Sequence, residues 1–260
     1  MQRGKTRPLP RRDLTLSPAA KRDINWMRGK LRHWFDHNSR SFWWREPGRS
    51  PYQVLTVEIL LQRTRASKVE MTLPSFFNLF PDWQAISSAL PESLEACLRP
   101  LGLWKNKARV LRSLAQVQFT PVTTAPRREE LEAMPGIGSY SASVVLATLF
   151  GRREPFLDVN MARVLERFFG PRKYANIRDD PYLHTLAARF VASPYFMDLN
   201  LAMLDLGALV CRPRPHCDLC PLGRRCRFNV SRVRSARAVP PRKGSPRCAG
   251  PEVGPICNSD

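Results

Sequence analysis

Four cysteines lie close together near the end of the sequence, at a spacing typical of metal-binding loops. They are Cys211, Cys217, Cys220 and Cys226, which gives the pattern C-x5-C-x2-C-x5-C. Four thiolates on short loops can close around a [4Fe–4S] cluster or a tetrahedral zinc ion. The N-terminal residues lack the apolar stretch of a secretory signal, so we expect a cytoplasmic protein with reduced thiols, associated with the nucleoid if the host is bacterial. The sequence therefore predicts a metal site across residues 211–226.

Two carboxylates stand at positions where they could act on a substrate. Glu58 lies within the apolar run Val-Glu-Ile-Leu-Leu, where burial of an unpaired carboxylate is costly and raises its pKa toward neutrality. Asp158 comes just before a predicted helix at 160–169, a position for which aspartate is well suited as an N-cap. A hydrogen-bonded core glutamate and a helix cap are the plain interpretations. General acid catalysis by Glu58 and electrostatic stabilisation by Asp158 are the alternatives.

A glycine turn and a strongly basic composition point to nucleic acid. Residues 131–149 are predicted to form two helical stretches joined by Pro135, Gly136, Ile137 and Gly138. The backbone N–H groups of such a turn, with the N-terminus of the second helix, can bind one phosphate, as in the helix-hairpin-helix DNA-binding motif. A plain αα-hairpin has the same pattern. The 42 basic against 22 acidic residues give a net charge of +20, which attracts polyanions.

The elements that must position these residues are predicted to be helical. Apolar residues recur at helical spacing, residues 52–69 are apolar nearly all round, and alternating strand runs are absent, so the predicted fold is all-α. No apolar run is long enough to span a membrane. Residues 1–23 and 229–260 are basic and rich in proline, which predicts disordered arms. The predicted helices cover residues 23–37, 52–69, 73–80, 91–101, 105–117, 131–149 and 160–169.

The hairpin followed by a four-cysteine loop resembles the endonuclease III and MutY superfamily of helix-hairpin-helix DNA glycosylases. The similarity extends from about residue 24 to 228 and includes FWWREPGRSPYQVLTVEILLQRT, PFLDVNMARVLERF and LAMLDLGALVC. The resemblance implies a [4Fe–4S] cluster and two helical lobes, one from 51–162 with the hairpin and one joining 24–50 to 163–228. The first cysteine interval is one residue shorter than the family usually has, which leaves zinc as the alternative metal.

The resemblance also implies roles for single residues. In this family the aspartate matching Asp158 stabilises the positive charge on the sugar, and the glutamate matching Glu58 contacts or protonates the flipped base. Tyr140 stands where bifunctional members carry the lysine that forms a Schiff base, so no lyase activity is expected; a core tyrosine is the plain interpretation. Gln62 and Arg63 match residues that fill the space left by the flipped nucleotide.

The resemblance is greatest to the thymine mismatch branch, in which a tyrosine matches Tyr140. We therefore expect a monomeric, monofunctional glycosylase that flips thymine or uracil opposite guanine out of double-stranded DNA and hydrolyses its glycosidic bond. Residues 227–260 are too few and too polar for the 8-oxoguanine-reading domain common in the adenine branch. One alternative is a MutY-like adenine glycosylase acting on A·G or A·8-oxoguanine pairs. The other is a non-catalytic hairpin protein, although carboxylates near phosphates do not favour simple binding.

Overall fold

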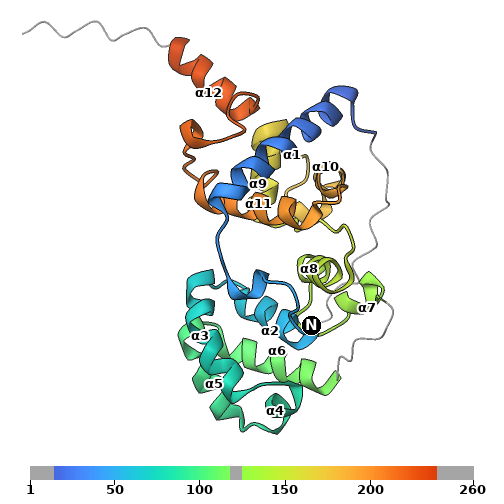
Figure 1. Cartoon of the computed structure of the whole chain (residues 1–260), viewed down its shortest axis with the longest axis vertical. Helices are drawn as coiled ribbons and strands as arrows, with labels where there is room; N and C mark the ends of the chain where they lie inside the picture. Colours follow the sequence, from blue (N-terminus) through green and yellow to red (C-terminus); the bar gives the residue numbers. More distant parts are fainter. Residues whose placement is uncertain (1–14, 118–124, 239–260) are drawn as a thin grey trace, which may run out of the picture.

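The computed structural model describes residues 15–117 and 125–238, and within these ranges every regular element is helical (Figure 1). This confirms the predicted all-α class. No helix of the described part is long and apolar enough to cross a membrane. The α-helices are α1 (Pro18–Asn38), α2 (Pro51–Leu61), α3 (Ala66–Leu79), α4 (Trp83–Ser88), α5 (Pro91–Leu98), α6 (Trp104–Val117), α7 (Arg128–Glu132), α8 (Ser139–Phe150), α9 (Val159–Phe169), α10 (Pro181–Val191), α11 (Phe196–Leu209) and α12 (Arg227–Ala238).

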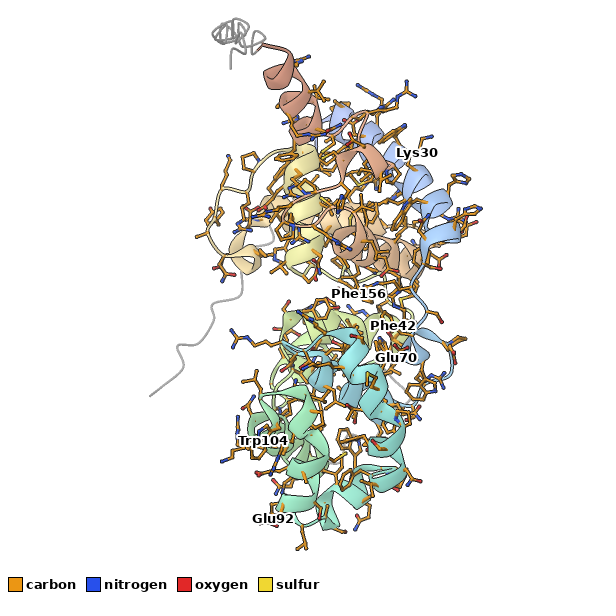
Figure 2. The ribbon with its side chains drawn as sticks, turned by 90° about the vertical axis from the view of Figure 1, so that its left-hand side faces the viewer. Lys30, Phe42, Glu70, Glu92, Trp104 and Phe156 are labelled. Carbon is orange, nitrogen blue, oxygen red and sulfur yellow. The ribbon has the colours of Figure 1, made fainter. Side chains whose placement is uncertain are left out.

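The helices pack around two hydrophobic cores, which form the two lobes seen one above the other in Figure 1 and, turned by 90°, in Figure 2. The first core takes its buried residues from α2 to α8, and the second takes them mainly from α1, α9, α10 and α11. Helix α8 contributes to both, because Val145 and Leu146 belong to the first core while Val144 and Ala147 belong to the second. The two-lobed fold is therefore confirmed, with α8 shared between the lobes.

The single helix predicted over residues 52–69 is wrong, because α2 ends at Leu61 and α3 begins at Ala66. The break has an identifiable cause. The Lys107 ammonium donates hydrogen bonds to the backbone oxygens of Ile59, Leu60 and Gln62, which occupies carbonyl groups at the C-terminus of α2. The chain then turns at Arg63, whose φ of 55° lies in the left-handed region.

The ends of the described chain also differ from the predicted arms. Helix α1 begins at Pro18, where Ser17 caps it by accepting a hydrogen bond from the Ala20 amide, so residues 18–23 are helical. Helix α12 includes residues 229–238 of the predicted tail. Residues 1–14 and 239–260 lie outside the described part. The predicted lobe boundary at 162 falls inside α9, whose buried residues all belong to the second core.

Candidate active site

Glu58 is held inside the first lobe by α2, a helix with buried residues on nearly every side. Helix α2 begins with a capping box in which Ser50 and Gln53 exchange side-chain-to-backbone hydrogen bonds, with Pro51 in its first turn. Glu58 follows two turns later and is only 8% exposed. Burial raises its pKa to about 7, against the smaller opposing effect of a hydrogen bond with the Ser141 hydroxyl of α8. The carboxyl group is therefore partly protonated near neutral pH.

Tyr140 lies at the start of α8, within electrostatic range of the two other predicted catalytic residues, Glu58 and Asp158. Its pKa is raised well above the usual value, first by burial and then by the negative charges of Glu58 and Asp158, while Arg45 has a smaller opposite effect. The ring contacts Phe156 edge to face, with centroids 6.2 Å apart, and Figure 2 shows Phe156 between the two lobes. Tyr140 is thus a neutral phenol that interacts with both carboxylates.

Asp158 is the N-cap of α9. One carboxylate oxygen accepts hydrogen bonds from the amides of Asn160 and Met161 at 2.9 and 2.8 Å, and the other accepts one from the Asn160 side chain at 2.7 Å. Burial raises the pKa of Asp158, and these hydrogen bonds oppose the increase. Asp158 is therefore a helix cap. A catalytic role is compatible with the cap, because the same hydrogen bonds hold the carboxylate in one orientation while its charge still acts on Tyr140.

Arg163, which the sequence analysis missed, connects the cap of α9 to the cysteine loop. Its guanidinium donates to the Asn160 side-chain oxygen at 2.7 Å, to Gly207 O at 2.9 Å and to Cys211 O at 2.7 Å. A Cβ at Gly207 would lie 2.6 Å from the Asn160 Cβ, so only glycine allows this close approach of α11 to α9. The first cysteine is thereby joined to Asp158 through two side chains.

Of the two glycines in the hairpin turn, only Gly136 lies where another element approaches closely. Gly136 has a φ of 73°, and a Cβ there would lie 2.4 Å from Val110 Cγ1 of α6. Gly138 has extended backbone and open space around it. Ile137 is buried, and its amide donates to Met134 O within the turn. Pro135 is half-buried beside it, and α8 begins without a side-chain cap, so the first amides of α8 are the donors best placed for a phosphate.

Gln62 and Arg63 form the turn after α2, next to the hairpin. The Gln62 side chain donates to Gly136 O at 2.9 Å, which ties the two turns together, and Arg63 is exposed. Lys107 beneath them is only 2% exposed, and burial lowers its pKa to about 8. Arg63 and the exposed Leu103, at φ 49°, are the two non-glycine residues with positive φ in the described ranges. Backbone strain of this kind concentrates at functional sites.

The four predicted metal ligands line a single pocket in the second lobe. Cys211, Cys217, Cys220 and Cys226 surround it together with Arg167, whose guanidinium lies 3.3 Å from the Cys211 sulfur. Burial raises the pKa of the Cys220 thiol to about 11. No three Cys, His, Asp or Glu side chains of the described residues are arranged to hold a single metal ion.

The comparisons with known proteins agree with this geometry. A family model described as the HhH-GPD superfamily of base excision DNA repair proteins matches residues 56–179. A thymine/uracil-DNA glycosylase of Methanothermobacter thermautotrophicus is 32% identical over 73% of this chain and 86% of its own length. The chain belongs to the HhH-GPD superfamily.

Two further relatives bear on the branch of this superfamily. The solved structure of a thermostable thymine-DNA glycosylase superimposes with a TM-score of 0.75 at 27% identity, covering 82% of this chain and 99% of that one. An adenine DNA glycosylase of Mycobacterium tuberculosis is 31% identical over 73% of this chain but only 63% of its own length. The predicted superfamily and its two-lobed fold are thus confirmed, and this HhH-GPD protein is a base-excision DNA glycosylase.

Proposed function

We propose that the protein is a monomeric, monofunctional glycosylase that removes thymine or uracil opposite guanine from double-stranded DNA. The observation that carries the proposal is that Tyr140 lies close enough to both Glu58 and Asp158 for their charges to raise its pKa. The site combines a buried carboxyl group that is partly protonated near neutral pH, a half-buried carboxylate and a neutral phenol. The thymine- and uracil-removing relatives support pyrimidine as the base class.

Asp158 is proposed to stabilise the sugar as the glycosidic bond breaks. The bonding electrons leave with the base, and the sugar gains positive charge at C1′. A carboxylate held by three hydrogen bonds cannot turn away from that charge, and its stabilisation needs no rearrangement during the reaction. Asp158 also orients the water whose oxygen then bonds to C1′.

Glu58 and Tyr140 are proposed to act on the flipped base and its sugar. Since the pKa of Glu58 is about 7, its protonated form can donate to an oxygen at the edge of the leaving pyrimidine. Tyr140 occupies the position of the Schiff-base lysine, and a phenol cannot form an imine. The reaction therefore ends with an abasic site and an intact strand.

The turns at the surface of the first lobe are proposed to bind the DNA. The uncapped N-terminus of α8 offers amides to one phosphate, with Gly136 allowing the close turn before it. Gln62 and Arg63 would occupy the space left by the flipped nucleotide. Lys107 supports this turn from below through three carbonyl groups, which keeps it preorganised for entry into the duplex.

We propose that the four cysteines hold a [4Fe–4S] cluster in preference to zinc. The four thiols line one pocket, and the superfamily that this sequence resembles usually holds a [4Fe–4S] cluster at the matching cysteines. Burial raises the pKa values of the Cys217, Cys220 and Cys226 thiols. Bound iron would have the opposite effect, because it stabilises the thiolate forms. The cluster would supply rigidity to the loop that Arg163 joins to the Asp158 cap. Iron and sulfide analysis of purified protein, together with visible absorbance, tests this assignment, and one zinc per chain would contradict it.

The activity is tested with duplexes that carry single T·G, U·G, A·G and A·8-oxoguanine pairs. After incubation, alkali converts abasic sites into strand breaks, so comparison with and without alkali separates glycosylase from lyase activity. We expect breaks in the T·G and U·G strands only after alkali. Breaks confined to the adenine strands would support the MutY-like alternative. Binding of every duplex with no break in any would support a non-catalytic DNA-binding protein.

A further inference from the structure

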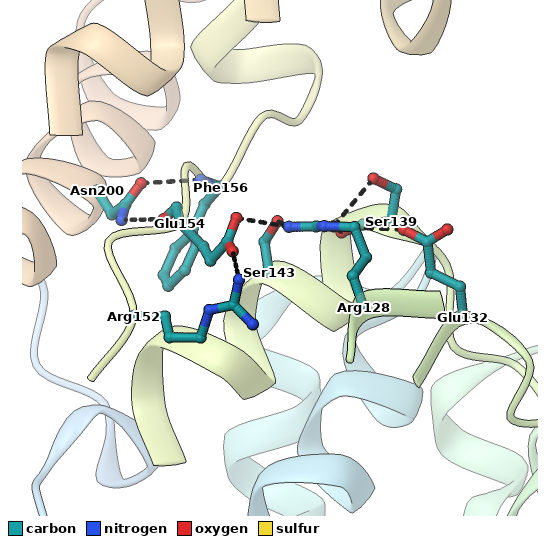
Figure 3. Close-up of polar contacts among 8 residues, drawn as sticks. All are labelled: Arg128, Glu132, Ser139, Ser143, Arg152, Glu154, Phe156 and Asn200. Atoms are coloured by element: carbon teal, nitrogen blue, oxygen red, sulfur yellow. Dashed lines mark hydrogen bonds and ion pairs between the residues drawn. The ribbon is translucent and has the colours of Figure 1, made fainter. Parts of the chain in front are cut away.

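Arg128 of the first hairpin helix joins three parts of the structure, as Figure 3 shows. Its guanidinium donates to Ser139 O at 3.1 Å and to Ser143 Oγ at 3.0 Å, both on α8. The same group forms an ion pair with Glu154 at 2.6 Å. The side chains of Arg128 and Glu154 are only 23% and 17% exposed, so the pair is less screened than a surface ion pair.

Glu154 lies in the segment that leads from α8 to Asp158, and the other side of this segment is bound by α11. The fully buried Asn200 of α11 donates to Glu154 O at 2.9 Å and accepts a hydrogen bond from the Phe156 amide at 2.8 Å (Figure 3). The Asn200 side chain thus satisfies one backbone acceptor and one backbone donor of the segment, as a neighbouring β-strand would. Residues 154–156 are thus bound to the hairpin through a side chain and to the second lobe through their backbone.

The segment contacts both Tyr140 and Asp158 of the candidate active site. The Phe156 ring contacts Tyr140, and Phe156 O accepts a hydrogen bond from the Asp158 amide at 2.9 Å. Asp158 is therefore two residues from a backbone position determined by Asn200 and four residues from the ion pair with Arg128. The residues on either side of Glu154 do not form a helix that would otherwise determine its path.

We propose that Arg128, Glu154 and Asn200 are positioning residues that determine where Asp158 lies relative to Tyr140 and Glu58. This inference rests on the proposed function, because it concerns the same reaction. The ion pair joins the hairpin to the segment that carries Asp158, so a phosphate bound at α8 and the carboxylate at Asp158 are held by the same set of contacts. A displacement of a reacting group by about 1 Å can lower a rate by roughly 100-fold.

The test compares Arg128→Met with Arg152→Met. Arg152 also pairs with Glu154, at 3.4 Å, but its side chain is 46% exposed and forms no ion pair with the described residues of the hairpin, so it is a matched control. The single-turnover excision rate is measured on a T·G or U·G duplex at saturating protein, and duplex affinity and thermal midpoint are measured separately. We expect Arg128→Met to lower the excision rate roughly 10- to 100-fold with affinity changed less than the rate, and Arg152→Met to retain the parent rate.

A second variant separates positioning from folding. Glu154→Gln keeps the shape of the side chain and removes its charge, so the protein should fold, and its excision rate should fall by a smaller factor than that of Arg128→Met. In the double variant the loss should be less than the product of the two single losses, because both act through one ion pair. A loss of excision rate in the double variant equal to the product of the two single losses would contradict action through one ion pair.

The outcomes separate the inference from the proposed function. If the parent protein excises neither thymine nor uracil, the proposed function fails. If the parent is active while Arg128→Met and Glu154→Gln excise at its rate, the positioning inference is wrong and the function stands. A loss that disappears at saturating protein would also overturn the inference, because Arg128 would then serve DNA affinity alone.

Discussion

The buried Glu58 carboxyl should make the stability of the protein depend on pH in a direction opposite to that of most acidic residues. Its pKa is about 7 in the folded chain against an ordinary value of 4.5, and this difference corresponds to about 3 kcal/mol. The folded state therefore binds the proton more tightly than the unfolded state. The stabilisation is complete below about pH 4.5 and is lost as the pH rises through about 7.

Glu58→Gln removes this dependence because glutamine stays neutral at every pH. We expect the variant to gain stability relative to the parent by roughly 2–3 kcal/mol as the pH rises from about 5 to about 8.5, which corresponds to roughly 5–10 °C in thermal midpoint. Chemical denaturation at the two pH values measures the change. Glu70→Gln, at an exposed position of α3, is the control and should behave like the parent at both. An equal difference between Glu58→Gln and parent at both pH values would refute the reasoning.

Other substitutions have equally definite outcomes. Asp158→Asn keeps an oxygen that can cap α9 but removes the charge, so single-turnover excision should fall by about 100-fold or more at similar duplex affinity. Lys107→Met removes the ammonium donor shared by three carbonyl groups and should cost on the order of 2 kcal/mol in urea denaturation, with weaker duplex binding. Cys217→Ser should lower the iron content and the folded yield, measured by metal analysis and gel filtration. Tyr140→Lys should create weak strand cleavage that borohydride traps as a covalent adduct, whereas the parent protein should form none.

The sequence was sufficient for features that depend on local pattern. The cysteine intervals, the glycine turn and the apolar run around Glu58 each lie within about one or two helical turns, and short-range spacing is preserved when the chain folds. The N-cap at Asp158 could likewise be predicted, because a cap is decided by the residues next to it.

Features that depend on distant partners could not be predicted in this way. The end of α2 is determined by Lys107, more than forty positions along the chain, so the apolar pattern continued through residue 69 although the helix did not. Arg128 and Glu154 are each ordinary charged residues in the sequence, and only folding brings them to 2.6 Å. The contact of Arg163 with the cap of α9 had only a weak signal in the sequence, namely a basic residue about one turn after Asp158.

The sharing of α8 between the two cores has a consequence for how the molecule unfolds. If the first lobe opened alone, Val145 and Leu146 would lose their burial, and α8 would no longer hold Val144 and Ala147 in place for the second lobe. Neither half is therefore expected to survive as a folded fragment after proteolysis between the lobes. Amide protons of α8 beyond its uncapped first turn should exchange with solvent only when the whole chain unfolds, at the slowest rates in the molecule. Because Tyr140 begins this helix, the reaction centre should persist until global unfolding and then be lost in a single transition.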